Sequence, residues 1–380
     1  MTAAKGLTLL ALATVACGQP RPVPSITMQQ QSYGRFQPVV DYLRSQVDSA
    51  FPGATIAVGY GDSVVLLAAV GHYDADDKRP VTTETIYDLA SLTKVIGLTT
   101  AAMMLVDSGK LDLDAPAQRY VPMFQGANKD RVTIRHLLTH SSGMPAWRPL
   151  YAEAKTREEA LALVDTTALL RQPGDTFVYS DLGAMVLAQA VQAVSGERLD
   201  DFLAARLFGP LGMTSTRYLP PESWRRRIAA TENDTVFRHR VLRGEVHDEN
   251  AGRLGGVSGH AGLFSTAPDL ARFATWLLRL RTIDSLHVRD FTHKQGIPPG
   301  SSRALGWDTP SENSSAGTKM GPNAFGHTGF TGTSIWFDPD RNLFIVLLTN
   351  RVNPTRANTK IFQVRRRVAD LVNDALTPPP

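Results

Sequence analysis

The feature that most restricts the fold of this 380-residue chain is the position of its strand-like segments, which lie near both ends. Residues 54–60 and 64–70 are short apolar runs on either side of a Gly-Asp pair, so they predict a β-hairpin. Residues 333–337 and 343–349 predict a second hairpin. Between the hairpins, residues 89–280 carry alanine- and leucine-rich segments separated by proline and glycine, which predict helices.

This arrangement predicts an α/β fold with one antiparallel sheet built from the N- and C-terminal segments. Predicted helices at residues 36–49 and about 361–376 would flank the sheet. The sheet domain would then comprise residues 34–88 and 281–380, with a mostly helical domain, residues 89–280, inserted between them. We expect the functional site in the crevice between the two parts.

The first 33 residues resemble an export signal followed by a tether. Residues 1–17 carry a short apolar run that is too short for a stable membrane span and ends at the only cysteine, Cys17. The segment resembles the lipobox of bacterial lipoproteins, although Thr14 stands where an aliphatic residue is usual. We therefore expect a periplasmic or cell-envelope protein, lipid-anchored through Cys17 and a tether at 18–33; simple cleavage after Ala16 is the alternative.

Composition excludes several other classes of protein. A content of 43% hydrophobic and 20% charged residues is ordinary for a globular chain, and the single cysteine excludes a disulfide framework within the chain. The net charge of +4 comes largely from scattered arginines. The short basic runs at 225–227 and 365–367 are more typical of solvated helix faces than of a nucleic-acid site.

The chemistry is suggested first by Ser91 and Lys94, which lie three residues apart at the start of an apolar, helix-like segment. Residues at this spacing share one helix face, so the hydroxyl and the amine can meet. Near a helix start the backbone N–H of Ser91 would also be unpaired and available to an oxyanion. Alone, such a pair is more often a helix cap followed by a solvated lysine.

Two later triplets strengthen the functional interpretation. Tyr179-Ser180-Asp181 follows a Pro-Gly turn, and His327-Thr328-Gly329 directly precedes the last predicted hairpin. Three such motifs in this order are rare by chance.

With these motifs the chain resembles the serine β-lactamase and penicillin-binding-protein superfamily. It is most similar to the class C-like branch, which includes D-alanyl-D-alanine carboxypeptidases and related esterases. The resemblance covers roughly residues 36–375. It is supported by segments 87–90, 132–144, 246–251 and 255–266.

The resemblance implies a role for each motif. Ser91 would attack an acyl carbonyl, Lys94 and Tyr179 would exchange its proton, and the backbone N–H groups of Ser91 and Phe330 would hold the oxyanion. The 327–329 segment would line the opposite wall and bind substrate. Water would release the acyl group, and neither a metal nor an organic cofactor is implied.

Ionisation sets a condition on such a site. Deprotonating a free lysine at pH 7 costs about 4.6 kcal/mol and a free tyrosine about 4 kcal/mol, whereas a helix N-terminus offsets only about 0.3–1 kcal/mol. Burial or mutual coupling must supply the rest, so we expect Lys94 and Tyr179 to be buried and close. Sequence does not decide which of the two is the base.

Two positions depart from the class C pattern and bear on the substrate. Asp181 stands where these β-lactamases carry asparagine, and a carboxylate cannot donate the amide hydrogen bond that asparagine offers. It would contact substrate, form an ion pair with Lys94 or serve packing. His327 stands where many members carry lysine; unperturbed, it would be about one quarter protonated at pH 7 and would bind a carboxylate more strongly in acid.

Other chemistry-bearing residues are less informative. His136 and His140 have the spacing of a zinc pair but lack the glutamate of the H-E-x-x-H motif, so a structural role is favoured. His247, Asp248, Asn250 and His260 would either stabilise loops or line the cleft.

The leading hypothesis is a serine hydrolase that forms an acyl-enzyme at Ser91 and cleaves D-Ala-terminated peptides or carboxylic esters. A class C-like β-lactamase is the first alternative. A non-hydrolytic penicillin- or peptidoglycan-binding protein is the alternative from another class.

Overall fold

The computed structural model describes residues 33–282, 285–312 and 314–377. The predicted signal peptide, Cys17 and nearly all of the tether lie outside this range. No helix among the described residues is long and apolar enough to cross a membrane.

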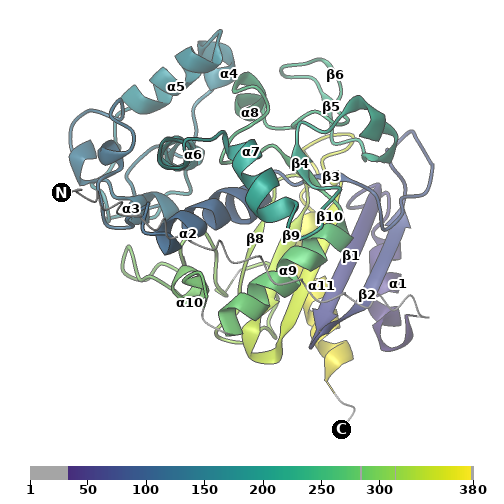
Figure 1. Cartoon of the computed structure of the whole chain (residues 1–380). Helices are drawn as coiled ribbons and strands as arrows, with labels where there is room; N and C mark the ends of the chain where they lie inside the picture. Colours follow the sequence, from purple (N-terminus) through teal and green to yellow (C-terminus); the bar gives the residue numbers. More distant parts are fainter. Residues whose placement is uncertain (1–32, 283–284, 313, 378–380) are drawn as a thin grey trace, which may run out of the picture.

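A five-stranded antiparallel sheet is built from both ends of the chain, as the sequence predicts (Figure 1). Its strand order is β2-β1-β10-β9-β8. The strands are β1 (Gly53–Tyr60), β2 (Ser63–Gly71), β8 (Phe325–Thr328), β9 (Ser334–Asp338) and β10 (Leu343–Thr349). The first and last segments meet where Ala57 of β1 pairs with Val346 of β10, so the centre of the sheet joins residues almost 300 positions apart.

Helices cover both faces of this sheet. On one face lie α1 (Gln37–Ser45) and α11 (Ile361–Leu376), and on the other lies α9 (Ala267–Thr282). The alternation along β10 explains both layers, because Ile345 packs toward α1 and α11 while Val346 packs into the larger core on the opposite face. The sheet is therefore buried on both sides.

The inserted region is mostly helical and lies beside the sheet (Figure 1). Its longest helix, α6 (Asp181–Ser195), is buried along much of its length. The other helices are η2 (Lys94–Thr99), α2 (Thr100–Asp107), η3 (Ala117–Arg119), η4 (Lys129–Arg131), α3 (Ile134–Leu138), α4 (Leu150–Glu153), α5 (Arg157–Thr166), α7 (Leu199–Leu203), η5 (Ala204–Phe208), η6 (Glu222–Arg227) and α8 (Glu249–Arg253). Short strands β3 (Tyr87–Asp88), β7 (Leu263–Ser265) and β4 (Arg217–Tyr218) form a second sheet, and β5 (Asn233–Asp234) pairs with β6 (Arg240–Val241).

The structure refines three expectations. The first helix ends at Ser45, short of the expected residue 49. We expected the sheet domain to resume at residue 281, but α9 already packs against β1 and β10, so the sheet layer resumes earlier. The third difference is β8, an edge strand that the sequence reasoning did not identify. The remaining short elements are η1 (Gly34–Phe36), α10 (Val288–Thr292) and η7 (Pro339–Arg341).

Candidate active site

Ser91 follows a tight turn at the end of β3. Ala90 adopts the left-handed backbone conformation with φ 46°, and its N–H donates to the buried Asp88 carboxylate at 2.8 Å. Non-glycine residues adopt this conformation at a cost of roughly 1–2 kcal/mol. The chain then enters the π-helical segment η2, a rare geometry that occurs often at functional sites.

Lys94 lies one turn after Ser91, and its Nζ donates to Ser91 Oγ at 3.1 Å. The contact predicted from the spacing is therefore present. Lys94 is buried, and its Nζ also donates to the backbone carbonyl of His260 at 3.0 Å and forms a 2.6 Å ion pair with Asp181. Burial disfavours the ammonium, but the charge of Asp181, together with Tyr179, holds the pKa of Lys94 well above its usual value. The depressed lysine pKa that a neutral base requires is therefore not found.

Tyr179 lies next to Lys94, whose Nζ is 4.9 Å from the ring centroid. The Tyr179 hydroxyl oxygen is buried and has no hydrogen-bond partner among the described residues. His140 packs against the same ring at 4.5 Å between centroids, and its Nδ1 accepts from the backbone N–H of Ser180. This contact holds the segment that precedes α6. His140 thus has a structural role here, as the sequence reasoning favoured.

The opposite wall is β8 and the turn after it. His327 and Thr328 pair with β9, and Gly329 follows them and lies against Leu89, two residues before Ser91. A Cβ on Gly329 would lie 2.1 Å from Thr333 Oγ1 and 2.3 Å from the Leu89 carbonyl oxygen, so the position admits only glycine without displacement.

Two buried arginines fix this turn from behind. Arg365 Nη2 donates to the carbonyls of Gly329 and Thr333 at 2.6 and 2.7 Å, and Arg351 Nε donates to the Phe330 carbonyl at 2.7 Å. The backbone N–H groups of Phe330 and Ser91 donate to no other residue in the described segments. Both residues line the same pocket, so the two N–H groups are available to a ligand.

A pocket of about 300 Å³ lies between the two walls. Its lining includes Ser91, Tyr179, Arg303, Asp308, His327, Thr328, Gly329, Phe330, Trp336, Arg351, Phe362 and Arg365. Asp181, which we had considered for substrate contact, is not in this lining.

Arg303 is the site residue that sequence reasoning missed. It lies in the Ser-, Gly- and Pro-rich loop before β8, where no periodic pattern marks it. Its Nε and Nη1 atoms are buried without a hydrogen-bond partner among the described residues, and the nearest carboxylate oxygen, on Asp308, is 3.7 Å from Nε. A guanidinium in this state is suited to a carboxylate ligand.

His327 does not carry the charge that the sequence reasoning considered. Burial lowers its pKa well below 6.5, and the positive charges of Arg303 and Lys94 lower it further. The imidazole is therefore neutral at pH 7, and the expectation that it binds a carboxylate as a cation is wrong. One ring nitrogen, Nδ1, lies 2.8 Å from the Thr328 carbonyl, while Nε2 is buried without a partner among the described residues.

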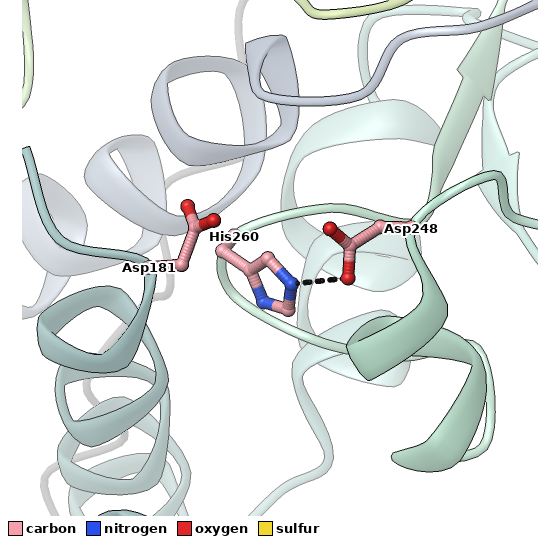
Figure 2. A group of neighbouring side chains, drawn as sticks. All are labelled: Asp181, Asp248 and His260. Atoms are coloured by element: carbon pink, nitrogen blue, oxygen red, sulfur yellow. Dashed lines mark hydrogen bonds and ion pairs between the residues drawn. The ribbon is translucent and has the colours of Figure 1, made fainter. Parts of the chain in front are cut away.

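Asp181, Asp248 and His260 form a cluster, with ligand-type atoms within 4.8 Å of one another (Figure 2). These residue types bind metals, but their atoms are already engaged. Asp181 pairs with Lys94, and His260 contacts Asp248 at 2.7 Å through Nε2 and Ser258 at 2.7 Å through Nδ1. The Lys94 ammonium is the cation of this cluster, so the arrangement does not favour a metal.

The remaining candidate residues from the sequence, His247, Asn250 and His136, stabilise loops and do not line the pocket. His247 pairs with Glu232 at 2.6 Å, which Arg356 also holds. Asn250 bonds to the backbone of Arg148 and Tyr151. His136 caps α3 through the backbone N–H of Thr133, which agrees with the structural role that its sequence context favoured.

Comparison with known proteins agrees with this fold. The beta-lactamase family model matches residues 3–370. A protein of Salmonella schwarzengrund (strain CVM19633), described as "Putative D-alanyl-D-alanine carboxypeptidase", is 32% identical over 84% of this chain and 83% of its own length.

Solved structures share the fold at lower identity. EstCE1, described as a hydrolase with promiscuous acyltransferase activity, superposes with a TM-score of 0.72 at 23% identity, over 90% of this chain and 100% of its own. A class C beta-lactamase superposes with a TM-score of 0.71 at 21% identity, over 92% and 100% of the two chains.

The fold and the Ser91–Lys94 pair define a serine hydrolase of the β-lactamase and penicillin-binding-protein type. The chain belongs to the beta-lactamase family.

Proposed function

We propose that the protein cleaves acyl compounds that carry a carboxylate near the scissile bond, with D-Ala-terminated peptides as the preferred class. The observation that carries this proposal is Arg303, whose buried Nε and Nη1 lack hydrogen-bond partners among the described residues and which shares a pocket with Ser91. Asp308 pairs with this guanidinium only at 3.7 Å, and buried N–H groups without hydrogen bonds are costly, so a bound carboxylate would be favoured there. The Salmonella relative named as a carboxypeptidase supports the same substrate class.

In this proposal Ser91 is the nucleophile, and Lys94 and Tyr179 manage its proton. The N–H groups of Ser91 and Phe330 hold the oxyanion, and Thr328 and Gly329 form the wall beside the bound acyl group. We further propose that the protein acts in the cell envelope, as its relatives' names suggest, exported and anchored through Cys17.

Arg303→Gln tests the substrate class. We expect KM for a D-Ala-D-Ala peptide to rise about 10- to 100-fold, because a hydrogen bond to a charged group contributes about 1.5–3 kcal/mol. Hydrolysis of the matching C-terminal amide or of an uncharged ester should change less than about threefold. Arg198→Gln is the control, since Arg198 is exposed, pairs with Asp200 and does not line the pocket. An equal loss on charged and uncharged substrates would contradict the role of Arg303.

Esterase activity is the second candidate. Asp181 is engaged by Lys94 and lies outside the pocket lining, so no side-chain amide is supplied at that position to an acylamino substrate. The pocket also contains Phe330 and Phe362, which are about half exposed and offer apolar contact to an acyl chain. This combination favours simple esters over β-lactams that carry acylamino groups.

The intact mass of the protein, truncated after Cys17 and exposed briefly to benzylpenicillin, separates the remaining alternatives. A persistent adduct that is absent in Ser91→Ala indicates a penicillin-binding enzyme with slow deacylation. Penicilloate without an adduct indicates a β-lactamase. Ester hydrolysis that survives intact in Ser91→Ala would contradict the nucleophile itself.

A further inference from the structure

Asp181 forms an ion pair with Lys94, and a mechanism in which Lys94 acts as a neutral base gives this carboxylate no role. Asp181 lies at the start of α6, and its Oδ1 is 2.6 Å from Lys94 Nζ. Its side chain is only 19% exposed, and it lies behind the pocket and not in its lining. Figure 2 shows Asp181 and Asp248 on opposite sides of His260.

The contacts of Lys94 are those of a charged ammonium. Its Nζ donates to Ser91 Oγ and to the His260 carbonyl, and it forms an ion pair with Asp181 Oδ1, an oxygen that has no hydrogen bond of its own among the described residues. An ammonium has no lone pair, so Nζ must lose a proton before it can accept one from Ser91. As it stands, Lys94 is therefore a donor to the serine oxygen and not an acceptor of its proton.

Other charged and titratable groups surround this ion pair from every neighbouring element. Tyr179 precedes α6, while Asp248 begins α8 and pairs with His260. The neutral rings of His140 and His327 and the Arg303 guanidinium face Lys94 from the other sides. Among the described residues, Asp181 supplies the one carboxylate in direct contact with Nζ.

We propose that Asp181 is the final acceptor of the Ser91 proton, acting through Lys94. One N–H bond of Nζ breaks and its proton passes to Asp181 Oδ1, which leaves a lone pair on Nζ. As Ser91 Oγ bonds to the acyl carbon, its O–H bond breaks and the proton passes to that lone pair. Lys94 is then an ammonium again, and Asp181 is a neutral acid.

The protons return to their starting positions when the leaving group departs. When the bond from the acyl carbon to the leaving group breaks, the leaving atom takes a proton from Lys94, and Asp181 returns its proton to Nζ. This inference rests on the proposed serine acyl-hydrolase function. It also explains why aspartate is useful at this position, because an asparagine side chain cannot take up a proton.

The pH dependence of Asp181→Asn tests the proposal, with kcat/KM measured on an uncharged nitrophenyl ester from pH 6 to 10. We expect wild-type kcat/KM to be nearly constant between pH 7 and 9. In Asp181→Asn it should fall at least about 100-fold at pH 7 and recover about tenfold per pH unit, because only the deprotonated fraction of Lys94 would then serve as base.

Asp248→Asn is the matched control. It removes a carboxylate from the same cluster that contacts His260 and not Nζ. We expect any loss to be the same factor at every pH, without alkaline recovery. A uniform loss in Asp181→Asn would indicate a merely structural role and overturn the proposal, as would equal or higher activity at pH 7.

A direct titration of Lys94 separates this inference from the proposed function. Lysine labelled with ¹³C at Cε, with the Lys94 signal assigned by Lys94→Arg, reports its ionisation by NMR without substrate. We expect wild-type Lys94 to remain charged through pH 10 and to titrate at lower pH in Asp181→Asn. If the wild type hydrolyses no ester, the proposed function fails, and an unchanged Lys94 titration would then overturn the ion-pair inference as well.

Discussion

The two walls of the pocket differ in how their charges are satisfied. On the helical side the charged groups are paired, Lys94 with Asp181 and His260 with Asp248, and the uncharged Tyr179 hydroxyl lacks a hydrogen bond among the described residues. On the sheet side, His327 Nε2 and the Nε and Nη1 atoms of Arg303 are buried without hydrogen-bond partners among the described residues, and Arg303 has only a 3.7 Å ion pair with Asp308. Buried polar groups normally find partners, so those that lack them indicate where a ligand binds. In the proposed mechanism, the helical wall supplies the groups of the chemical step, and the opposite wall supplies the groups that recognise substrate.

Gly329→Ala tests the sheet-side wall and should have the largest effect. The added Cβ would lie within 2.3 Å of atoms in Thr333 and Leu89, so the turn that carries Phe330 must shift. We expect kcat to fall at least about 100-fold, the loss typical of removing one oxyanion donor.

Gly183→Ala is the control for this substitution. Gly183 lies in α6, and an added Cβ there would meet its nearest neighbours at 3.6 Å, an ordinary contact distance. We expect kcat to change less than about threefold. If Gly329→Ala retained wild-type kcat, the rigidity assigned to this turn would be wrong.

The stability of the protein in mild acid tests the neutrality of the buried histidines. Burial lowers the pKa of both His140 and His327 well below 6.5, so below pH 6.5 the unfolded state binds more protons than the native state. The free energy of unfolding should therefore be maximal above pH 6.5 and fall on acidification, by up to about 1.4 kcal/mol per pH unit for each histidine.

Urea unfolding between about pH 6 and 7.5 measures this slope. The paired carboxylates Glu232 and Asp234, whose native pKa values are about 2, affect stability only where the unfolded-state carboxyls take up protons, at about pH 5 and below. Burial also lowers the pKa of His136, so His327→Gln should reduce the slope by about a third to a half, whereas His293→Gln, at an exposed position, should leave it unchanged. A slope that is the same in all three proteins would show that His327 is not buried in the neutral form.

Much of the framework follows from the sequence, because it depends on local patterns. The second hairpin matches its predicted strands to within a residue, and the terminal helix α11 matches its predicted bounds. Apolar runs on either side of a turn mark the strands, and helical spacing marks α11. The same helical spacing predicts the contact between Ser91 and Lys94.

The missed features depend instead on tertiary placement. Arg303 comes from an irregular loop, and only the fold brings it to Ser91. His327 loses its charge because the fold buries it near Arg303 and Lys94. Sequence left the role of Asp181 open between substrate contact, an ion pair and packing, and the 2.6 Å distance to Lys94 identifies the ion pair.

Ala90→Gly tests the turn between β3 and η2 and should have the smallest effect. The φ of 46° costs alanine about 1–2 kcal/mol, whereas the extra backbone entropy of glycine costs about 0.5–1 kcal/mol. The first quantity is larger, so the free energy of unfolding should rise by about 0.5–1 kcal/mol. The same substitution at Ala102, inside α2, should lower it by about 1 kcal/mol, because the backbone there is ordinary helix. Equal destabilisation by both substitutions in urea unfolding would show that the turn before Ser91 is not strained.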